Sequence, residues 1–176
     1  MINPIEIQIF VSNPSDVNTE KEIVQNVCGR INDRLSAIDC NVRYLVKEWN
    51  KLIGKFGVNP QKEIESAIGE YDIYFGIWWK KFGSDTGIIN LETGKDFGSG
   101  TYREFYLAYS MWKIKKVPNI YLFFKKETTN DLFKAEVHSE VGKVIDFEKS
   151  QQPNNDVHQA QFGSIKTFHK VSGLIL

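Results

Sequence analysis

The 176-residue sequence has few of the features that mark secreted, membrane-spanning or nucleic-acid-binding proteins. It holds two cysteines, Cys28 and Cys40, which form no metal-binding or disulfide pattern, so we expect a reducing, cytoplasmic location. No uncharged apolar run approaches the roughly 20 residues that cross a bilayer. The residues after Met1 lack the basic start and apolar core of a signal peptide. The 22 basic and 22 acidic residues balance, which argues against a surface dedicated to nucleic acid.

Several catalytic signatures are also absent. The sequence contains no Walker A loop, no G-x-G-x-x-G, no G-x-S-x-G elbow and no C-x-x-C. Its histidines, His138, His158 and His169, are scattered, and none has a cysteine or acid at the spacing of a metal ligand. We therefore expect no metal site, and there is little support for a serine or cysteine nucleophile paired with a histidine base.

The remaining composition is that of an ordinary globular domain. Hydrophobic residues make up 41% and charged residues 25% of the chain, and its length fits one domain with a sizeable core. We predict a single domain over residues 1–176. The apolar ending Val171–Leu176 is abrupt, which fits either a domain whose chain continues in a longer protein or a terminal strand docked on the sheet.

Strand-like and helix-like patterns alternate along the chain. Strands are predicted over Ile5–Val11, Val42–Val46, Asp72–Trp79, Pro118–Phe124 and Val144–Phe147. Helices are predicted over Asp16–Ala37, Pro60–Ile68, Thr101–Lys113 and Val157–Lys170. Ser15 or Asp16 can cap the first of these helices.

This alternation predicts an α/β fold with a parallel sheet and helices on both faces. Five strands favour a flavodoxin-like three-layer sandwich with strand order 2-1-3-4-5. In such sheets ligands bind above the carboxyl ends of the strands, near the switch point between the first and third strands. The loop that follows the first strand and the loop Lys80–Gly100 would border that place.

The segment Gly98–Phe105 offers one carboxylate, Glu104, one turn inside a predicted helix and behind a flexible Gly-Ser-Gly approach. Local sequence favours a structural role, because Thr101-x-x-Glu104 matches a capping box. In that motif the threonine accepts from the third helical amide and the glutamate reaches back to the cap amide. The alternative is that the helix aims Glu104 into a ligand pocket above the sheet.

The end of the third predicted strand carries aromatic and basic residues. Trp78 and Trp79 are adjacent in a strand, so they point to opposite faces, and one of them is expected in the core. The other can stack on a flat ring. Lys80 and Lys81 are typical of a solvated turn, although they can also contact phosphate oxygens. Phe82-Gly83 is typical of a turn.

The order and spacing of these motifs resemble the TIR-like (Toll/interleukin-1 receptor) domains of bacterial defence proteins. The opening Phe10-Val11-Ser12-x-Pro14-Ser15-Asp16-Val17 resembles their first strand and helix start. Asp72–Trp78, Phe82-Gly83-x-x-Thr86-Gly87, Ser99-Gly100-Thr101-x-x-Glu104-Phe105 and Pro118–Phe124 resemble the segments that follow. The match extends from about Ile5 to Lys125. It departs from receptor domains at Asp72, where many have serine, and in its longer loop Lys80–Ser99.

The resemblance implies a TIR fold, and many bacterial TIR domains cleave the bond between nicotinamide and ribose in NAD+. It places the catalytic role on Glu104. The residues that it places around the substrate are Ser12, Asn13, Trp78, Trp79, Lys80, Phe82, Ser99 and Thr101. It also places the self-association loop at Trp49–Pro60, and it implies a homo-oligomer and a C-terminal NTPase or sensor region. NAD+ would be the substrate, and no further cofactor is implied.

One carboxylate is enough for this reaction. Ordinary glycosidases need a second one to protonate the leaving oxygen. Nicotinamide in NAD+ is already cationic on the ribose and leaves as a neutral molecule. Two alternatives stay open at the level of sequence: a non-catalytic TIR-like module that signals by self-association, and a nucleoside N-glycosidase related to deoxyribosyltransferases.

Overall fold

The computed structural model describes residues 3–47, 71–125 and 135–151. The strands are β1 (Ile5–Ser12), β2 (Val42–Lys47), β3 (Ile73–Trp78) and β4 (Asn119–Phe124). The helices are η1 (Ser15–Val17), α1 (Asn18–Ala37), α4 (Gly100–Lys115) and α5 (Ala135–Ser150).

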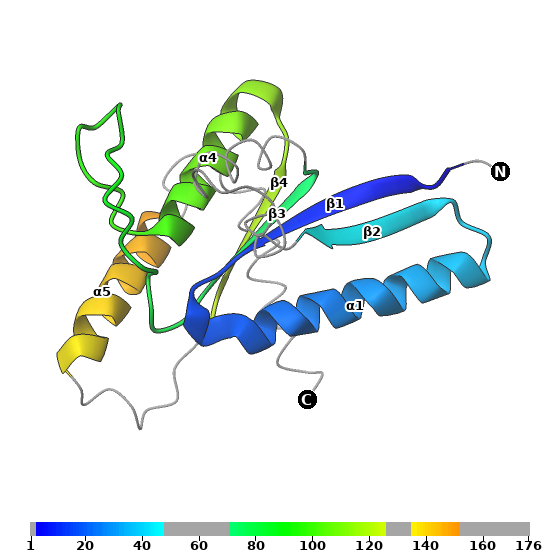
Figure 1. The fold of residues 1–176 in the computed structure, drawn as a ribbon, viewed down its shortest axis with the longest axis horizontal. Helices are drawn as coiled ribbons and strands as arrows, with labels where there is room; N and C mark the ends of the chain where they lie inside the picture. Colours follow the sequence, from blue (N-terminus) through cyan, green and yellow to red (C-terminus); the bar gives the residue numbers. More distant parts are fainter. Residues whose placement is uncertain (1–2, 48–70, 126–134, 152–176) are drawn as a thin grey trace, which may run out of the picture.

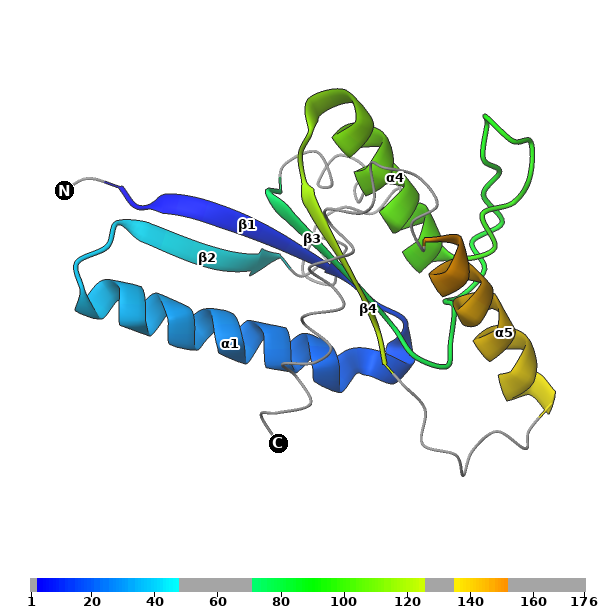
Figure 2. The same ribbon diagram turned by 180° about the vertical axis from the view of Figure 1, so that it is seen from behind.

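The strands form a parallel four-stranded sheet in the order β2-β1-β3-β4, which confirms the predicted α/β class and the order of the first four strands. Figure 1 shows α1 running along β2, with α4 and α5 together at the other end of the molecule. The view from behind in Figure 2 agrees. All the strands therefore end at one shared edge, where a ligand is expected in such a sheet.

Helices α4 and α5 cover one face of the sheet. On this face lies a cluster of large aromatic side chains, in which Phe10, Tyr74 and Trp78 are almost completely buried. Phe105 from α4 and Phe147 from α5 pack edge to face, with ring centroids 5.2 Å apart. Aromatic rings bury more apolar area than other side chains, so this cluster is the larger part of the core.

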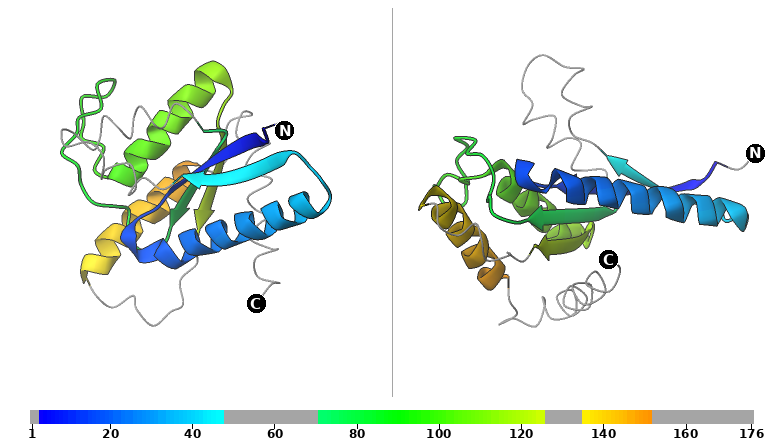
Figure 3. Two further views of the ribbon diagram at one scale, coloured as in Figure 1. Left: turned by 45° about the vertical axis from the view of Figure 1, so that its right-hand side comes forward. Right: turned by 90° about the horizontal axis from the view of Figure 1, so that it is seen from below.

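Helix α1 covers the opposite face, where Ile9, Val11 and Ile77 pack with Val17 and Cys28. Figure 3 shows the sheet between α1 and the pair of α4 and α5. The strand residues alternate between the two faces, so Phe10 and Ser12 lie on the α4 side and Ile9 and Val11 on the α1 side.

The predicted fifth strand at Val144–Phe147 is wrong, because these residues lie inside α5. Val141, Val144 and Phe147 are buried at a spacing of three, so they form one apolar stripe of a helix. A short apolar run cannot be assigned to a strand or a helix by its length alone. The predicted helices Pro60–Ile68 and Val157–Lys170 and the loop Trp49–Pro60 lie outside the described residues.

Candidate functional site

Ser12 and Glu104 meet at the edge where the parallel strands end. Ser12 is the last residue of β1 and is fully buried, and Glu104 lies in the second turn of α4 and is partly buried. The Ser12 hydroxyl donates a hydrogen bond to Glu104 Oε2. The contact joins residues that are 92 positions apart in the sequence, so the fold brings the predicted Ser12 and Glu104 together.

Glu104 has no part in capping the helix, which corrects the capping-box prediction. Helix α4 begins at Gly100, and its N-cap is Ser99, whose side chain accepts from the Tyr102 amide at 3.2 Å. Thr101 is therefore already inside the helix, and Glu104 is too far along to reach the cap amide. With the cap supplied by Ser99, the contact to Ser12 at the end of β1 is the interaction that holds the Glu104 carboxyl.

The surroundings of Glu104 favour its protonated form. Burial is the largest influence and raises the pKa of Glu104 to about 7, although the residue keeps some solvent exposure. The hydrogen bond from Ser12 and the charges of Arg103 and Lys21 act in the opposite direction. A carboxyl with a pKa near neutrality can exist in both protonation states under physiological conditions, which is common at functional sites.

Two buried tyrosines next to this carboxyl were not predicted as site residues. Tyr71 and Tyr74 stack with Phe10 at centroid distances of 5.3 and 6.1 Å. Both hydroxyl groups are buried and have no hydrogen-bond partner among the described residues. Burial, followed by the charge of Glu104, raises the pKa of both tyrosines. Tyr74 lies within the apolar strand pattern and Tyr71 just before it, so both look like core positions and no separate pattern marks them as site residues.

The loop after β1 is fastened to the loop after β3. Asp16 Oδ2 accepts from the amides of Lys80 and Lys81, each at 3.0 Å. Neither η1 nor α1 has a side-chain cap, so the prediction that Ser15 or Asp16 caps the first helix is wrong. The predicted Asn13 lies in this loop, where its Nδ2 donates to the Pro14 carbonyl at 2.9 Å and its Oδ1 is buried without a partner among the described residues.

The two tryptophans divide between the faces of the sheet. Trp78 is fully buried on the α4 side, stacks on Phe124 with centroids 5.8 Å apart, and offers no surface to a ligand. Trp79 packs on the α1 side, with the Lys80 and Lys125 ammonium groups 4.1 and 4.2 Å from its ring centroid. The fold therefore does not bring Trp79 and Lys80 to the face that carries Glu104.

Phe82, Ser99 and Thr101 lie at the turn beneath α4. Ser99 Oγ donates to the Phe82 carbonyl at 2.7 Å, and a Cβ at Gly83, where φ is +121°, would lie 2.4 Å from that same Oγ. Only glycine adopts this backbone and leaves the room that Ser99 needs. Phe82 and Ser99 thus hold the loop against the helix and set the position of Glu104 one turn further along, with Thr101 buried beside them.

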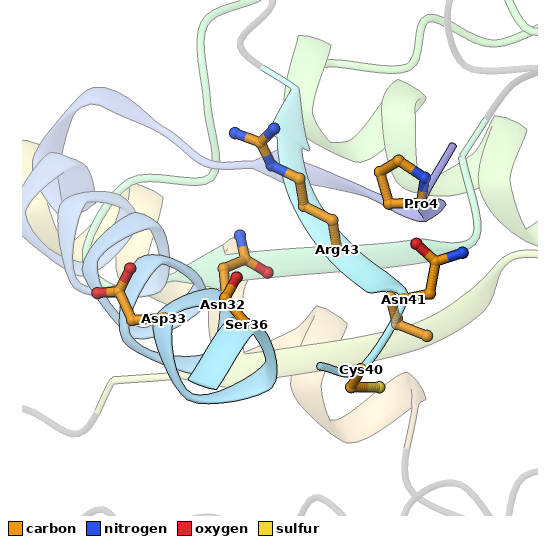
Figure 4. A pocket seen from close by; sticks show the side chains of 8 residues that line it. Pro4, Asn32, Asp33, Ser36, Cys40, Asn41 and Arg43 are labelled. Carbon is orange, nitrogen blue, oxygen red and sulfur yellow. The ribbon is translucent and has the colours of Figure 1, made fainter. Parts of the chain in front are cut away.

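A pocket lies at the opposite edge of the sheet, where α1 ends and β2 begins. Figure 4 shows that its lining comes from α1, β2 and the turn between them, with Pro4 beside β1. The lining residues are Pro4, Asn32, Asp33, Ser36, Cys40, Asn41, Val42 and Arg43. None of them is a predicted site residue, and the pocket is separate from Ser12 and Glu104.

The described part of the chain holds no cluster of three or more His, Cys, Asp or Glu side chains placed to bind a metal ion. Within that part, no helix combines the length and apolar character that crossing a membrane requires. No protein-family model, no curated protein and no solved structure matches the chain. The TIR-like resemblance therefore stays a prediction that rests on the sequence.

Proposed function

We propose that this chain is an NAD+ glycohydrolase of the TIR-like class, with Glu104 as the catalytic carboxylate. The observation that carries the proposal is the placement of Glu104. It is free of the helix cap, partly buried, and held by Ser12 at the edge of the sheet where the strands end. Ligands of parallel α/β sheets bind at this edge.

A single carboxylate at this position suits cleavage of an N-glycosidic bond whose leaving group is already cationic. As nicotinamide departs as a neutral molecule, positive charge develops on the ribose ring. An ionised Glu104 stabilises that charge most effectively in a poorly hydrated site. Glu104 Oε2 accepts from Ser12, and among the described residues no hydrogen bond is made to Oε1, so this oxygen is available for a ribose hydroxyl.

The pKa of Glu104 gives this proposal a pH dependence. The reaction needs the carboxylate, and burial raises the pKa of Glu104 to about 7. Below that pH the group becomes protonated, so we expect kcat/KM for NAD+ to fall about tenfold per pH unit below about pH 7. A flat profile between about pH 5 and 7 would contradict a catalytic Glu104 with this pKa.

The direct test incubates the purified chain with NAD+ and follows nicotinamide release by chromatography. It is run over a range of protein concentrations because the resemblance implies activation by self-association. Glu104→Gln keeps the size of the side chain but removes the charge. We expect a loss of about 10²- to 10³-fold in kcat, the usual effect of removing one electrostatic contact to the transition state. Glu22→Gln, on the exposed part of α1, is the matched control and keeps full activity.

The remaining outcomes separate the alternatives. Absence of nicotinamide release from a verified oligomer would leave a self-association module as the better reading. Release of free base from deoxynucleosides, with NAD+ untouched, would favour a nucleoside N-glycosidase. The wider proposal, a cytoplasmic effector of bacterial anti-phage immunity that works as an oligomer with a C-terminal sensor region, rests on the resemblance alone.

A further inference from the structure

Gly76 allows the Tyr74 ring to lean along β3 toward the end of the sheet. A Cβ at Gly76 would lie 3.0 Å from Tyr74 Cε1 and 2.4 Å from Trp78 Cζ3, so both rings occupy the space that a side chain would need. Gly76 is also the residue of β3 that pairs with Ser12 of β1. The edge of the Tyr74 ring therefore lies over the strand position next to Ser12.

The Tyr74 hydroxyl is bonded to the ring carbon next to Cε1, and both Ser12 and Glu104 lie close enough to influence it. Tyr74 is fully buried, and its hydroxyl has no hydrogen-bond partner among the described residues. The charge of Glu104 raises the pKa of Tyr74, and the Ser12 hydroxyl lies close enough to lower it, although the Tyr74 and Ser12 hydroxyls do not meet the geometry of a hydrogen bond. A buried hydroxyl without a partner is costly, so a small rotation that gives it an acceptor is favourable.

We propose that Tyr74 is a positioning residue whose hydroxyl donates to Ser12 Oγ and thereby directs the Ser12 proton onto Glu104. The direction of the relay is fixed by its chemistry. An ionised carboxylate only accepts, so Ser12 donates to Glu104, and the Ser12 oxygen is left to accept from Tyr74. The relay holds Glu104 Oε2 from one side and leaves Oε1 free for a ligand.

Four other side chains act on Glu104 or border it. Arg103 on α4 and Lys21 on α1 stabilise its negative charge, and Tyr71, just before β3, lies within electrostatic reach of it. Phe105 of α4 packs against the Tyr74 ring, with centroids 6.4 Å apart. Among these groups Tyr74 alone leans over the β3 residue that pairs with Ser12, which distinguishes its effect from that of Tyr71.

The test follows the protonation of Glu104 by carbon NMR of its side-chain carboxyl across pH, on the full chain and without substrate. Tyr74→Phe removes only the hydroxyl. We expect the midpoint of the Glu104 titration to move to higher pH, because a donor that stabilises the carboxylate has been lost. The proton concentration at the midpoint should be about threefold to tenfold lower than in the unaltered chain. In the Ser12→Ala background Tyr74→Phe should shift the midpoint far less, because the relay is already broken. Tyr121→Phe, on the other face of the sheet, is the matched control and leaves the midpoint unchanged.

Two results would overturn the relay. One is an unchanged Glu104 midpoint in Tyr74→Phe. The other is a shift of equal size in the Ser12→Ala background or in Tyr71→Phe, which would indicate general polarity instead of a path through Ser12. The relay can also be tested on the unaltered chain. The chemical shift of Tyr74 Cζ should change with pH with the same midpoint as Glu104, and a shift that does not change counts against the relay.

The relay through Tyr74 rests on the proposed function only where it predicts an effect on NAD+ cleavage. If the chain cleaves NAD+, the rising limb of the kcat/KM profile moves to higher pH in Tyr74→Phe, by the same factor as the NMR midpoint. If NAD+ is not cleaved by the unaltered chain, the proposed function fails while the NMR titration still decides the relay.

Discussion

Two polar clusters at opposite edges of the sheet are built in different ways. At the edge where the strands begin, Asn32 of α1 uses both ends of its amide: Nδ2 donates to the Tyr44 carbonyl and Oδ1 accepts from the Tyr44 amide, each at 2.8 Å. At the edge where the strands end, Glu104 has a pKa raised by burial, and the nearby Tyr74 hydroxyl and Asn13 Oδ1 have no partner among the described residues.

The difference separates polar groups that hold the fold from polar groups available for chemistry. Asn32 completes hydrogen bonds that would otherwise be missing at the edge strand β2. The groups around Glu104 lower the stability of the folded state instead, as is common where a protein keeps a site ready for a ligand. The pocket in Figure 4 lies at the Asn32 edge, whereas the side chains suited to chemistry lie at the opposite edge, around Glu104.

The largest expected effect on stability is at Glu104. Its pKa is about 7 in the folded state and about 4.5 as a reference, so the folded state binds more protons between these values. The stabilisation from protonated Glu104 is complete below about pH 4.5 and is lost as the pH rises through 7. Glu104→Gln should therefore unfold like the unaltered chain near pH 4.5 and gain up to about 3 kcal/mol above pH 7. Urea unfolding across this range measures it, and a variant that is less stable at pH 8 would contradict the comparison.

A smaller loss is expected at Gly76, on the face that carries Glu104. In Gly76→Ala the new methyl group meets the Trp78 ring, which is fully buried and cannot rotate away. Overpacking of this kind costs about 2 kcal/mol and would displace the Tyr74 ring as well. Thermal unfolding gives the loss. Gly142→Ala in α5, where a Cβ meets nothing within 4 Å, is the control and should be neutral or stabilising.

At the other edge, Asn32→Ala leaves the Tyr44 amide and carbonyl without their partner. Each bond is worth about 1 kcal/mol, so a loss of about 1 to 2 kcal/mol is expected, with no change in activity per folded molecule. Denaturant unfolding and the NAD+ assay, run together, measure both quantities. A drop in activity with stability unchanged would mean that the Asn32 cluster is functional after all.

The last comparison concerns the helix cap, and its smallest effect is at Thr101. Ser99→Ala removes the group that accepts from the Tyr102 amide and donates to the Phe82 carbonyl, so it should cost about 1 to 2 kcal/mol. Thr101→Val keeps the shape of its side chain and should cost less, because Thr101 is not the cap. If Thr101→Val proved the more harmful of the two in thermal unfolding, the capping box read from the sequence would be right and the observed cap wrong.

The sequence predicts the parts of the fold that depend on local patterns. The apolar run of β3, the alternation of β1 and the order of the four strands all follow from periodicity and from the geometry of parallel sheets. The strand predicted at Val144–Phe147 fails because a four-residue apolar run also fits one face of a helix. The stripe Val141, Val144 and Phe147 was the available signal for that helix.

The site is harder to predict because it depends on contacts between distant residues. Thr101-x-x-Glu104 matches a capping box locally, but the helix begins earlier, and Ser99 is its N-cap residue. Asp16 looks like a helix cap, yet its carboxylate reaches two amides 64 and 65 residues away. Tyr74 becomes a site residue only because Gly76 lets its ring lean toward Ser12. No local pattern shows that Gly76 pairs with Ser12.

Asp16 also determines how the two loops at this edge can move. One carboxylate oxygen accepts from consecutive amides of the loop after β3, while Asp16 itself lies in η1, shortly after β1. The Asp16 carboxylate therefore makes the two shorter hydrogen bonds between these segments, beside a longer one from Lys81 Nζ to Ser15 Oγ at 3.4 Å, so a ligand that displaces one segment also releases the other. Opening is then a two-state step instead of two independent motions. In hydrogen exchange the Lys80 and Lys81 amides should open together, and Asp16→Ala should speed both by the same factor.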